Sequence, residues 1–266
     1  MAKVLALARH TNMVWLQGWG CEVRDWGFCV TVRNPDFAEY NAIVDLKQAG
    51  FLDRALELVE SEFAQSPARP TIYLSAEAAF ESARSSLAHA GYHPVTRTQR
   101  LVARNGQFLS STRTGMRLIP TTADSLSQWI LLYQENYGIV PRDSAANVRR
   151  WTRLFSDVPA VHFFLIEAAG DVAGTVQLVA TGNGCCGIYG LSMRRSLHSL
   201  FTLRALYREL LAKFIELGAE WLCFERLRPI TRRSEAASRP SQKRIRWQDI
   251  DWEVLALEWG YRRDGE

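Results

Sequence analysis

The residues with the clearest chemical potential lie between Gly190 and Trp221, where GLSMRRSL leads into a long helical pattern. Leucines and aromatic residues recur there at three- and four-residue steps, which is typical of an amphipathic helix. The IYGLSM that overlaps its start is typical of a buried strand. A turn between a strand and a helix offers N–H groups and the helix dipole to an anion, and Arg194 and Arg195 add positive charge. This stretch is therefore a candidate phosphate site, although its turn contains no glycine.

Metal and disulfide chemistry are not expected. The cysteines are odd in number and include no CxxC spacing, which argues against both a disulfide framework and a structural zinc site. We interpret them as small apolar residues. They are Cys21, Cys29, Cys185, Cys186 and Cys223.

The composition is that of a soluble globular protein, with 47% apolar and 23% charged residues in 266. No apolar run approaches the ~18 residues that a membrane span needs. The opening MAKVLALARH is too short for a secretory signal, so we expect a cytoplasmic protein.

The positive formal charge of +4 comes from residues 226–246, which contain eight basic side chains and a single acidic one, Glu235. Aromatic residues do not interleave these arginines until Trp247, and no nucleic-acid motif accompanies them. A solvated, mobile loop is the preferred interpretation, and nucleic acid is not an expected partner.

The first half of the chain alternates strand and helix signals up to a polar, turn-rich linker at 105–115. Strands are predicted at 27–33, 40–47, 71–75 and 94–104, and helices at 51–66 and from Ser75 to Gly91. A helix is the alternative prediction for residues 40–47.

The second half begins with a strand and two helices and continues as a meander. Its three strands VHFFLIEA, VAGTVQLVA and CCGIYGLSM are joined by AAGD and by TGNG, whose Asn-Gly is a strong hairpin signal. The helix at 199–217 then leads to a strand at 219–225, which implies a parallel, right-handed crossover. A last helix is predicted at 247–259.

This order of elements resembles the GNAT superfamily of acyl-CoA-dependent N-acyltransferases over about residues 112–266. The resemblance rests on IYGLSM entering the crossover helix and on LEWGYRR near the end. The first half resembles a degenerate copy, because LAHAGYHPVTRTQRLV shares the Gly-Tyr ending of LALEWGYRR. The resemblance implies a tandem α/β protein with a mixed sheet, an antiparallel meander and a parallel crossover. Its expected lobes are 1–110, which is degenerate, and 111–266, which includes the basic loop 226–246.

For function, the resemblance implies acyl transfer from acetyl-CoA or another acyl-CoA to an amine of a small molecule or protein. No metal and no membrane are implied, and a homodimer is a further expectation. The Met193 amide would polarise the thioester. The residues expected to bind the co-substrate are Leu191, Met193, Arg194, Arg195 and Arg204.

Two side chains are candidates for proton transfer. Glu225 ends the predicted fifth strand and would act as the base towards the amine, with a surface carboxylate as the alternative. Tyr189 would orient the acceptor or donate a proton, with a core aromatic as the alternative.

The chain departs from the family at the cofactor loop, which reads R/Q-x-x-G-x-G/A in the family. Here His198 takes the place of the arginine, and Phe201 and Leu203 take the glycine positions. The family's usual tyrosine acid falls at Ala256. If the loop binds CoA, the charge of Arg194, Arg195 and Arg204 must replace what the glycines supply. The alternative is that these arginines are solvated residues flanking the helix and that Phe201 belongs to the core. Three hypotheses follow: an acyltransferase, a non-catalytic GNAT-fold module that binds a ligand or protein, and a nucleic-acid-associated protein using the basic segment.

Overall fold

The chain folds into two compact units in a computed structural model. Unit 1 contains the chain up to Trp19 and then Leu101–Phe224, and unit 2 contains Gly20–Arg100 and the chain from Glu225 through the last strand. The structure describes residues 2–35, 40–66, 69–75, 84–104, 115–138, 144–197, 200–229 and 244–250.

Unit 1 is built on a mixed set of strands in the order β10-β9-β8-β7-β6. Neighbours are antiparallel from β9 through β6, whereas β9 and β10 are parallel. This is the meander followed by a crossover that the sequence predicts, and it is confirmed. The strands are β6 (Met116–Pro120), β7 (Val161–Ala168), β8 (Asp171–Ala180), β9 (Cys185–Met193) and β10 (Trp221–Pro229). Of β10, only residues 221–224 belong to unit 1.

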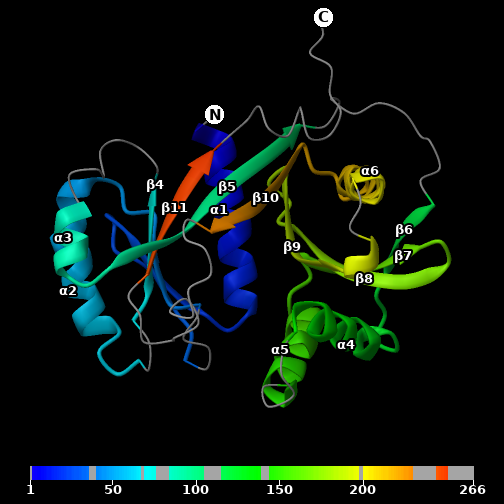
Figure 1. The fold of residues 1–266 in the computed structure, drawn as a ribbon, viewed down its shortest axis with the longest axis horizontal. Helices are drawn as coiled ribbons and strands as arrows, with labels where there is room; N and C mark the ends of the chain where they lie inside the picture. The colour runs from blue at the N-terminus through cyan, green and yellow to red at the C-terminus, as the bar shows by residue number, and fades with distance from the viewer. Residues whose placement is uncertain are drawn as a thin grey trace, which may run out of the picture. The chain divides into compact units, whose positions relative to one another are not determined.

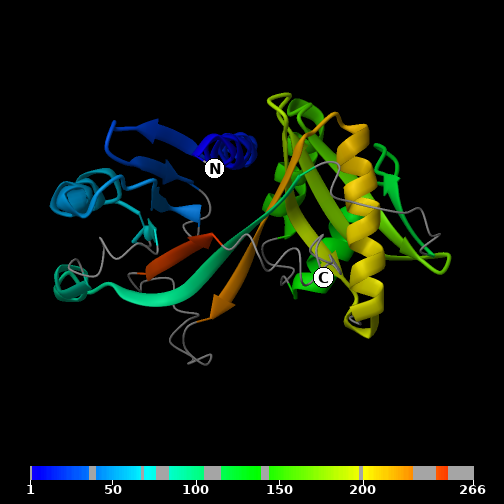
Figure 2. The same cartoon turned by 90° about the horizontal axis from the view of Figure 1, so that it is seen from above.

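Helices cover both faces of these strands. Figures 1 and 2 show α4 and α5 on one face and α6 on the opposite face. The Trp129 indole of α4 donates to the Phe164 carbonyl of β7 at 3.0 Å, which fixes that helix to the sheet. The helices are α1 (Ala2–Gly18), α4 (Leu126–Tyr137), α5 (Ser144–Asp157) and α6 (Leu200–Glu216), with a short 3-10 turn at Arg195–Leu197.

The apolar stripe of α6 forms the core of unit 1 on its own face of the sheet. Leu210 and Phe214 are fully buried against Val176 and Leu178 of β8. The helix ends at Gly218, whose φ of 73° only glycine adopts readily. Its amide bonds to the Ile215 carbonyl, and that of Ala219 bonds to Phe214, which is the Schellman pattern of helix termination.

Unit 2 contains strands in the order β1-β2-β3-β4-β11-β5, antiparallel at first and parallel from β3 onward. Its core gathers Ile43, Val59, Phe63, Ile72 and Leu87. The elements are β1 (Glu22–Asp25), β2 (Val30–Arg33), β3 (Ala42–Val44), a 3-10 turn (Ala49–Phe51), α2 (Leu52–Glu62), β4 (Thr71–Ser75), α3 (Arg84–His89), β5 (His93–Arg104) and β11 (Arg244–Ile250).

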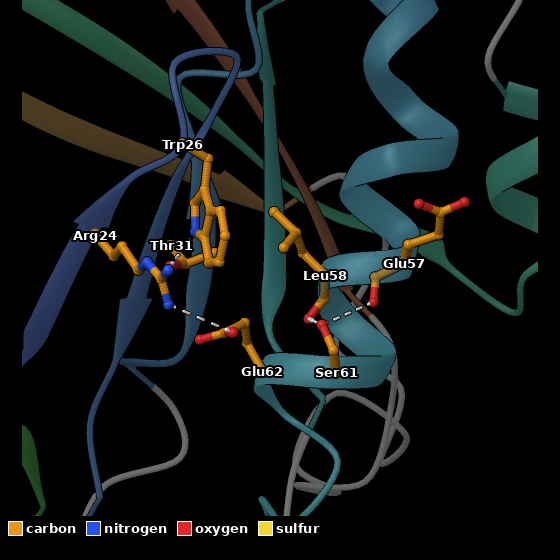
Figure 3. Close-up of polar contacts among 7 residues, drawn as sticks. All are labelled: Arg24, Trp26, Thr31, Glu57, Leu58, Ser61 and Glu62. Carbon is orange, nitrogen blue, oxygen red and sulfur yellow. Dashed lines mark hydrogen bonds and ion pairs between the residues drawn. The ribbon is translucent and has the colours of Figure 1, made fainter.

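Polar contacts join the β1–β2 hairpin to the end of α2 (Figure 3). Arg24 lies 3.7 Å from the Glu62 carboxylate and stacks over Trp26, whose indole donates to Thr31 at 3.0 Å. In the last turn of α2, the Ser61 hydroxyl bonds back to helix carbonyls of Glu57 and Leu58. These exposed contacts orient the hairpin, while the free energy of folding comes mainly from the buried core.

The structure corrects the prediction of a final helix. Residues 247–250 belong to β11, and 251–259 lie outside the described residues. β11 pairs in parallel with both β4 and β5, so tertiary pairing overrides the helical pattern of the sequence. Strand also extends into both ends of the predicted basic loop, because β10 runs to Pro229 and β11 starts at Arg244.

Candidate active site on strand β9

The candidate site lies on β9, because its two neighbouring strands, β8 and β10, pair with different lengths of it. On one side it pairs with β8 as far as Met193, which lies opposite Gly174. On the other side, the described parallel pairing joins Cys185–Gly187 to Trp221–Cys223 and ends there. β9 continues from that point to Met193, so its distal half is where a ligand can approach the strand edge.

A β-bulge lies in this distal half. Thr175 is opposite Ser192 and Gln177 is opposite Tyr189, so Gly190 and Leu191 face the single residue Val176 of β8. Gly190 has φ of 54°, which a residue with a side chain adopts at a cost. The bulge brings Tyr189 and Ser192 to the same face of the sheet.

A chain of hydrogen bonds fixes the bulge. The Asn136 amide of α4 donates to the Ser192 hydroxyl at 3.1 Å, which lies 2.7 Å from the Thr175 hydroxyl. Thr175 in turn donates to the Gly190 carbonyl at 3.2 Å, so the Ser192 hydroxyl donates to Thr175 and all the hydrogen bonds run in one direction. The Tyr137 hydroxyl donates to the Leu191 carbonyl at 2.9 Å. The bulge is thereby held as a rigid feature.

The ladder geometry sets the direction of the Met193 amide. The Arg194 amide donates to the Ala173 carbonyl at 3.0 Å. In an antiparallel pair this bond makes Gly174–Met193 a non-hydrogen-bonded pair, whose N–H and C=O groups point away from each other. The Met193 amide is therefore directed to the edge of β9 opposite β8, while its side chain is buried towards α6.

Helix α1 lies against β8 and β9 on the face that also carries Gln177 and Tyr189. The Trp15 indole stacks on the Tyr189 ring, with centroids 4.8 Å apart, and donates to the Gln177 amide oxygen at 2.9 Å. Gly187 permits this packing, because a Cβ there would meet the Tyr189 ring at 2.5 Å and Thr11 at 2.9 Å. Tyr189 is therefore a half-buried, stacked aromatic.

The basic turn after β9 presents charge on its surface. Arg194 and Arg195 are both exposed, and Arg195 begins the 3-10 turn that precedes α6. Since the Arg194 amide is bonded to Ala173, guanidinium groups carry the positive charge of this turn. Arg204 lies in α6 and Glu225 in β10, and their side chains fall outside the described residues, as does all of His198.

The structure also identifies residues that sequence reasoning missed. Trp15 and Gln177 come together from positions 162 residues apart, and Asn136 reaches the bulge from another helix. Gln177 is fully buried, and its Nε2 has no hydrogen-bond partner among the described residues. Nothing in the local sequence marks these contacts.

The hydrogen bond from the Trp15 indole to Gln177 leads to a prediction about the stability of the protein. Trp15→Phe should destabilise the protein by about 1–3 kcal/mol, because it leaves the buried Gln177 oxygen without its donor. Trp15→Phe combined with Gln177→Met should recover part of that loss, since both buried polar groups are then removed together. Urea unfolding of the two variants measures the difference. A double variant less stable than Trp15→Phe would contradict the assignment.

Comparison with known proteins relates this geometry to a fold. No protein-family model and no curated protein matches the sequence. Solved structures do match, and a GCN5-related N-acetyltransferase from Kribbella flavida is 17% identical, covering 82% of this chain and 85% of its own, with a TM-score of 0.55. A second from Sphaerobacter thermophilus is 17% identical, covering 79% and 75%, with a TM-score of 0.56.

The chain has the GNAT fold. A functionally unknown conserved protein from Staphylococcus epidermidis ATCC 12228 is also similar, at 9% identity and a TM-score of 0.56 over 80% of this chain and 85% of its own. In the GNAT fold of this chain, β9 is the strand that leads into the crossover helix α6. The sequence-based prediction of a two-lobed α/β fold of the GNAT type is thus confirmed. The tandem arrangement with lobes 1–110 and 111–266 stays a prediction.

The described residues contain no group of three or more possible metal ligands. None of the helices that the structure describes combines the length and apolar character needed to cross a bilayer.

Proposed function

We propose that this protein transfers an acyl group from acetyl-CoA or a related acyl-CoA to an amine. The observation that carries the proposal is the bulged β9, whose Met193 amide is directed away from β8 beyond the point where the described pairing with β10 ends. The GNAT fold of the chain supports it, and so do the exposed arginines of the turn that leads to α6.

The residues of this chain have distinct roles in the proposed reaction. The acyl carbonyl lies against the distal edge of β9, where the Met193 amide stabilises the oxyanion that forms when the amine attacks. Leu191 lines the same edge, and its carbonyl is already held by Tyr137. Collapse of the intermediate expels the thiolate of CoA and leaves the amide product.

Proton transfer and phosphate binding use separate groups. The family resemblance of the sequence gives Glu225 as the base for the attacking amine, acting directly or through water. Tyr189 orients the acceptor, held in place by its stack on Trp15. Arg194, Arg195 and Arg204 pair with the phosphates of CoA, because the turn lacks the glycines that would let backbone amides converge on them.

The test is calorimetric titration of the protein with acetyl-CoA, followed by a thiol-release assay against a panel of small amines and peptides. We expect binding in the micromolar range and release of CoA with at least one amine. Desulfo-CoA and free adenosine serve as controls for the thioester and the nucleotide. No heat of binding at high micromolar acetyl-CoA would leave a non-catalytic GNAT-fold module as the function.

A further inference from the structure

Two cysteine side chains, Cys185 of β9 and Cys223 of β10, contact each other within the described pairing of these strands. The Sγ atoms of Cys185 and Cys223 are 3.2 Å apart, although the residues are 38 positions apart in the sequence. Both side chains are buried, at 1% and 6% exposure, and they pack with Leu7 of α1 and with Trp221. This contact has no role in the proposed acyl transfer.

The surroundings of the pair disfavour a metal site. A structural zinc ion needs four ligands, and the described residues contain no group of three or more possible ligands. Two thiols whose sulfur atoms lie 3.2 Å apart instead have the arrangement that precedes a sulfur–sulfur bond.

The strand register shows what bond formation requires. Cys223 is opposite Gly187, so Cys185 is its diagonal neighbour on the adjacent strand. Diagonal neighbours in a sheet have Cα atoms about 7–8 Å apart, slightly beyond the usual 4.4–6.8 Å of a disulfide. The Cα atoms of the two cysteines must therefore approach by roughly 1 Å, which requires one strand to shift along the other rather than towards it. This is feasible at Cys223 because it is the last residue of the described pairing.

We propose that Cys185 and Cys223 form a redox-active dithiol, which closes to a reversible disulfide on exposure to a small disulfide such as glutathione disulfide. The thiolate of one cysteine attacks the oxidant, forming a mixed disulfide and releasing one glutathione. The second thiolate attacks the protein sulfur of that mixed disulfide and releases the second glutathione. Two protein thiols are oxidised, one glutathione disulfide is reduced, and the two thiol protons pass to the leaving thiolates.

The need to shift the two strands along each other strains this disulfide and makes it easily reduced. Easily reduced disulfides are typically regulatory rather than structural. Access is controlled by α1, since Leu7 packs over the pair. Cys186, one residue away, packs in the core on the α6 side, and burial together with Cys185 raises its pKa, which keeps it unreactive.

The experiment exposes the native protein to glutathione disulfide, alkylates the remaining thiols and maps the peptides by mass spectrometry. We expect a cross-link between the peptides of Cys185 and Cys223 that dithiothreitol reverses. The Leu7→Ala variant should form the cross-link several-fold faster, because a smaller side chain then shields the two thiols from the oxidant. Cys186→Ser should retain the cross-link, and Cys223→Ser should lose it.

Three outcomes would overturn the proposal. The first is that both thiols stay reduced in the wild type and in Leu7→Ala, even with the oxidant in large excess over glutathione. The second is that Cys185 pairs with another cysteine, and the third is that the bond forms only in denaturant. Since the readout is covalent, none of these depends on acyl transfer.

Discussion

Replacing Arg194 and Arg195 together with alanine is expected to weaken acetyl-CoA binding by about a hundredfold or more. Each charge-assisted contact to a phosphate contributes roughly 1.5–3 kcal/mol, and ~1.4 kcal/mol corresponds to a factor of ten in affinity. The loss is large because the turn contains no glycine that would let backbone amides converge on the pyrophosphate, so side-chain charge must hold it. Titration calorimetry of the double variant measures the change.

The thermal stability of the Arg194→Ala, Arg195→Ala variant should not fall along with its affinity for acetyl-CoA. Both arginines are exposed, so the thermal midpoint is expected to stay nearly unchanged. Arg149→Ala with Arg153→Ala is the matched control, since it removes two exposed charges from α5 in the same unit. If the control weakens binding as much as the loop variant, the effect is general electrostatics. Binding that survives the loop variant would contradict a phosphate role for this turn.

Much of the fold follows from local sequence patterns. Alternating and continuous apolar runs predict β6 to β9, and the Asn183-Gly184 turn predicts that β8 and β9 are adjacent. The leucine stripe and Gly218 predict α6 almost to the residue. These signals are local, so one sequence suffices to read them.

Features that depend on distant contacts could not be read in this way. Helix α1 was missed, because its place is set by a stack on Tyr189 and by the absence of a side chain at Gly187. The local sequence pattern predicts the start of a helix at β11, because the two strands that pair with β11 lie far away in the sequence. In each case tertiary contacts decide between local alternatives.

The candidate site shows the same division. The arginines of the turn and the strand before it were evident from residue type and spacing. The bulge was not, although Gly190 is its necessary residue, because a glycine in a strand is equally compatible with close packing. The hydroxyl chain from Asn136 to Gly190 requires three elements to be placed before it can be recognised.

Gly174→Ala is expected to destabilise the protein strongly and to weaken acetyl-CoA binding as well. A Cβ at this position would lie 2.2 Å from the Ser192 carbonyl oxygen and 3.1 Å from the Met193 Cα. These are backbone atoms of the adjacent strand, so relief requires β8 and β9 to separate at the bulge. We expect a cost of about 2–3 kcal/mol or more, and a thermal midpoint lower by roughly 5–10 °C.

The reason for the coupled effect is that Gly174 and Met193 are partners in the ladder that directs the Met193 amide. Gly50→Ala is the matched control, because a Cβ there meets no atom within 4 Å and its φ lies outside the left-handed region. It should be neutral or slightly stabilising. Calorimetric scans and acetyl-CoA titrations of both variants separate the outcomes. A Gly174→Ala protein with wild-type stability would mean that β8 and β9 are not packed this closely. One that is destabilised but binds normally would mean that the bulge does not position the thioester.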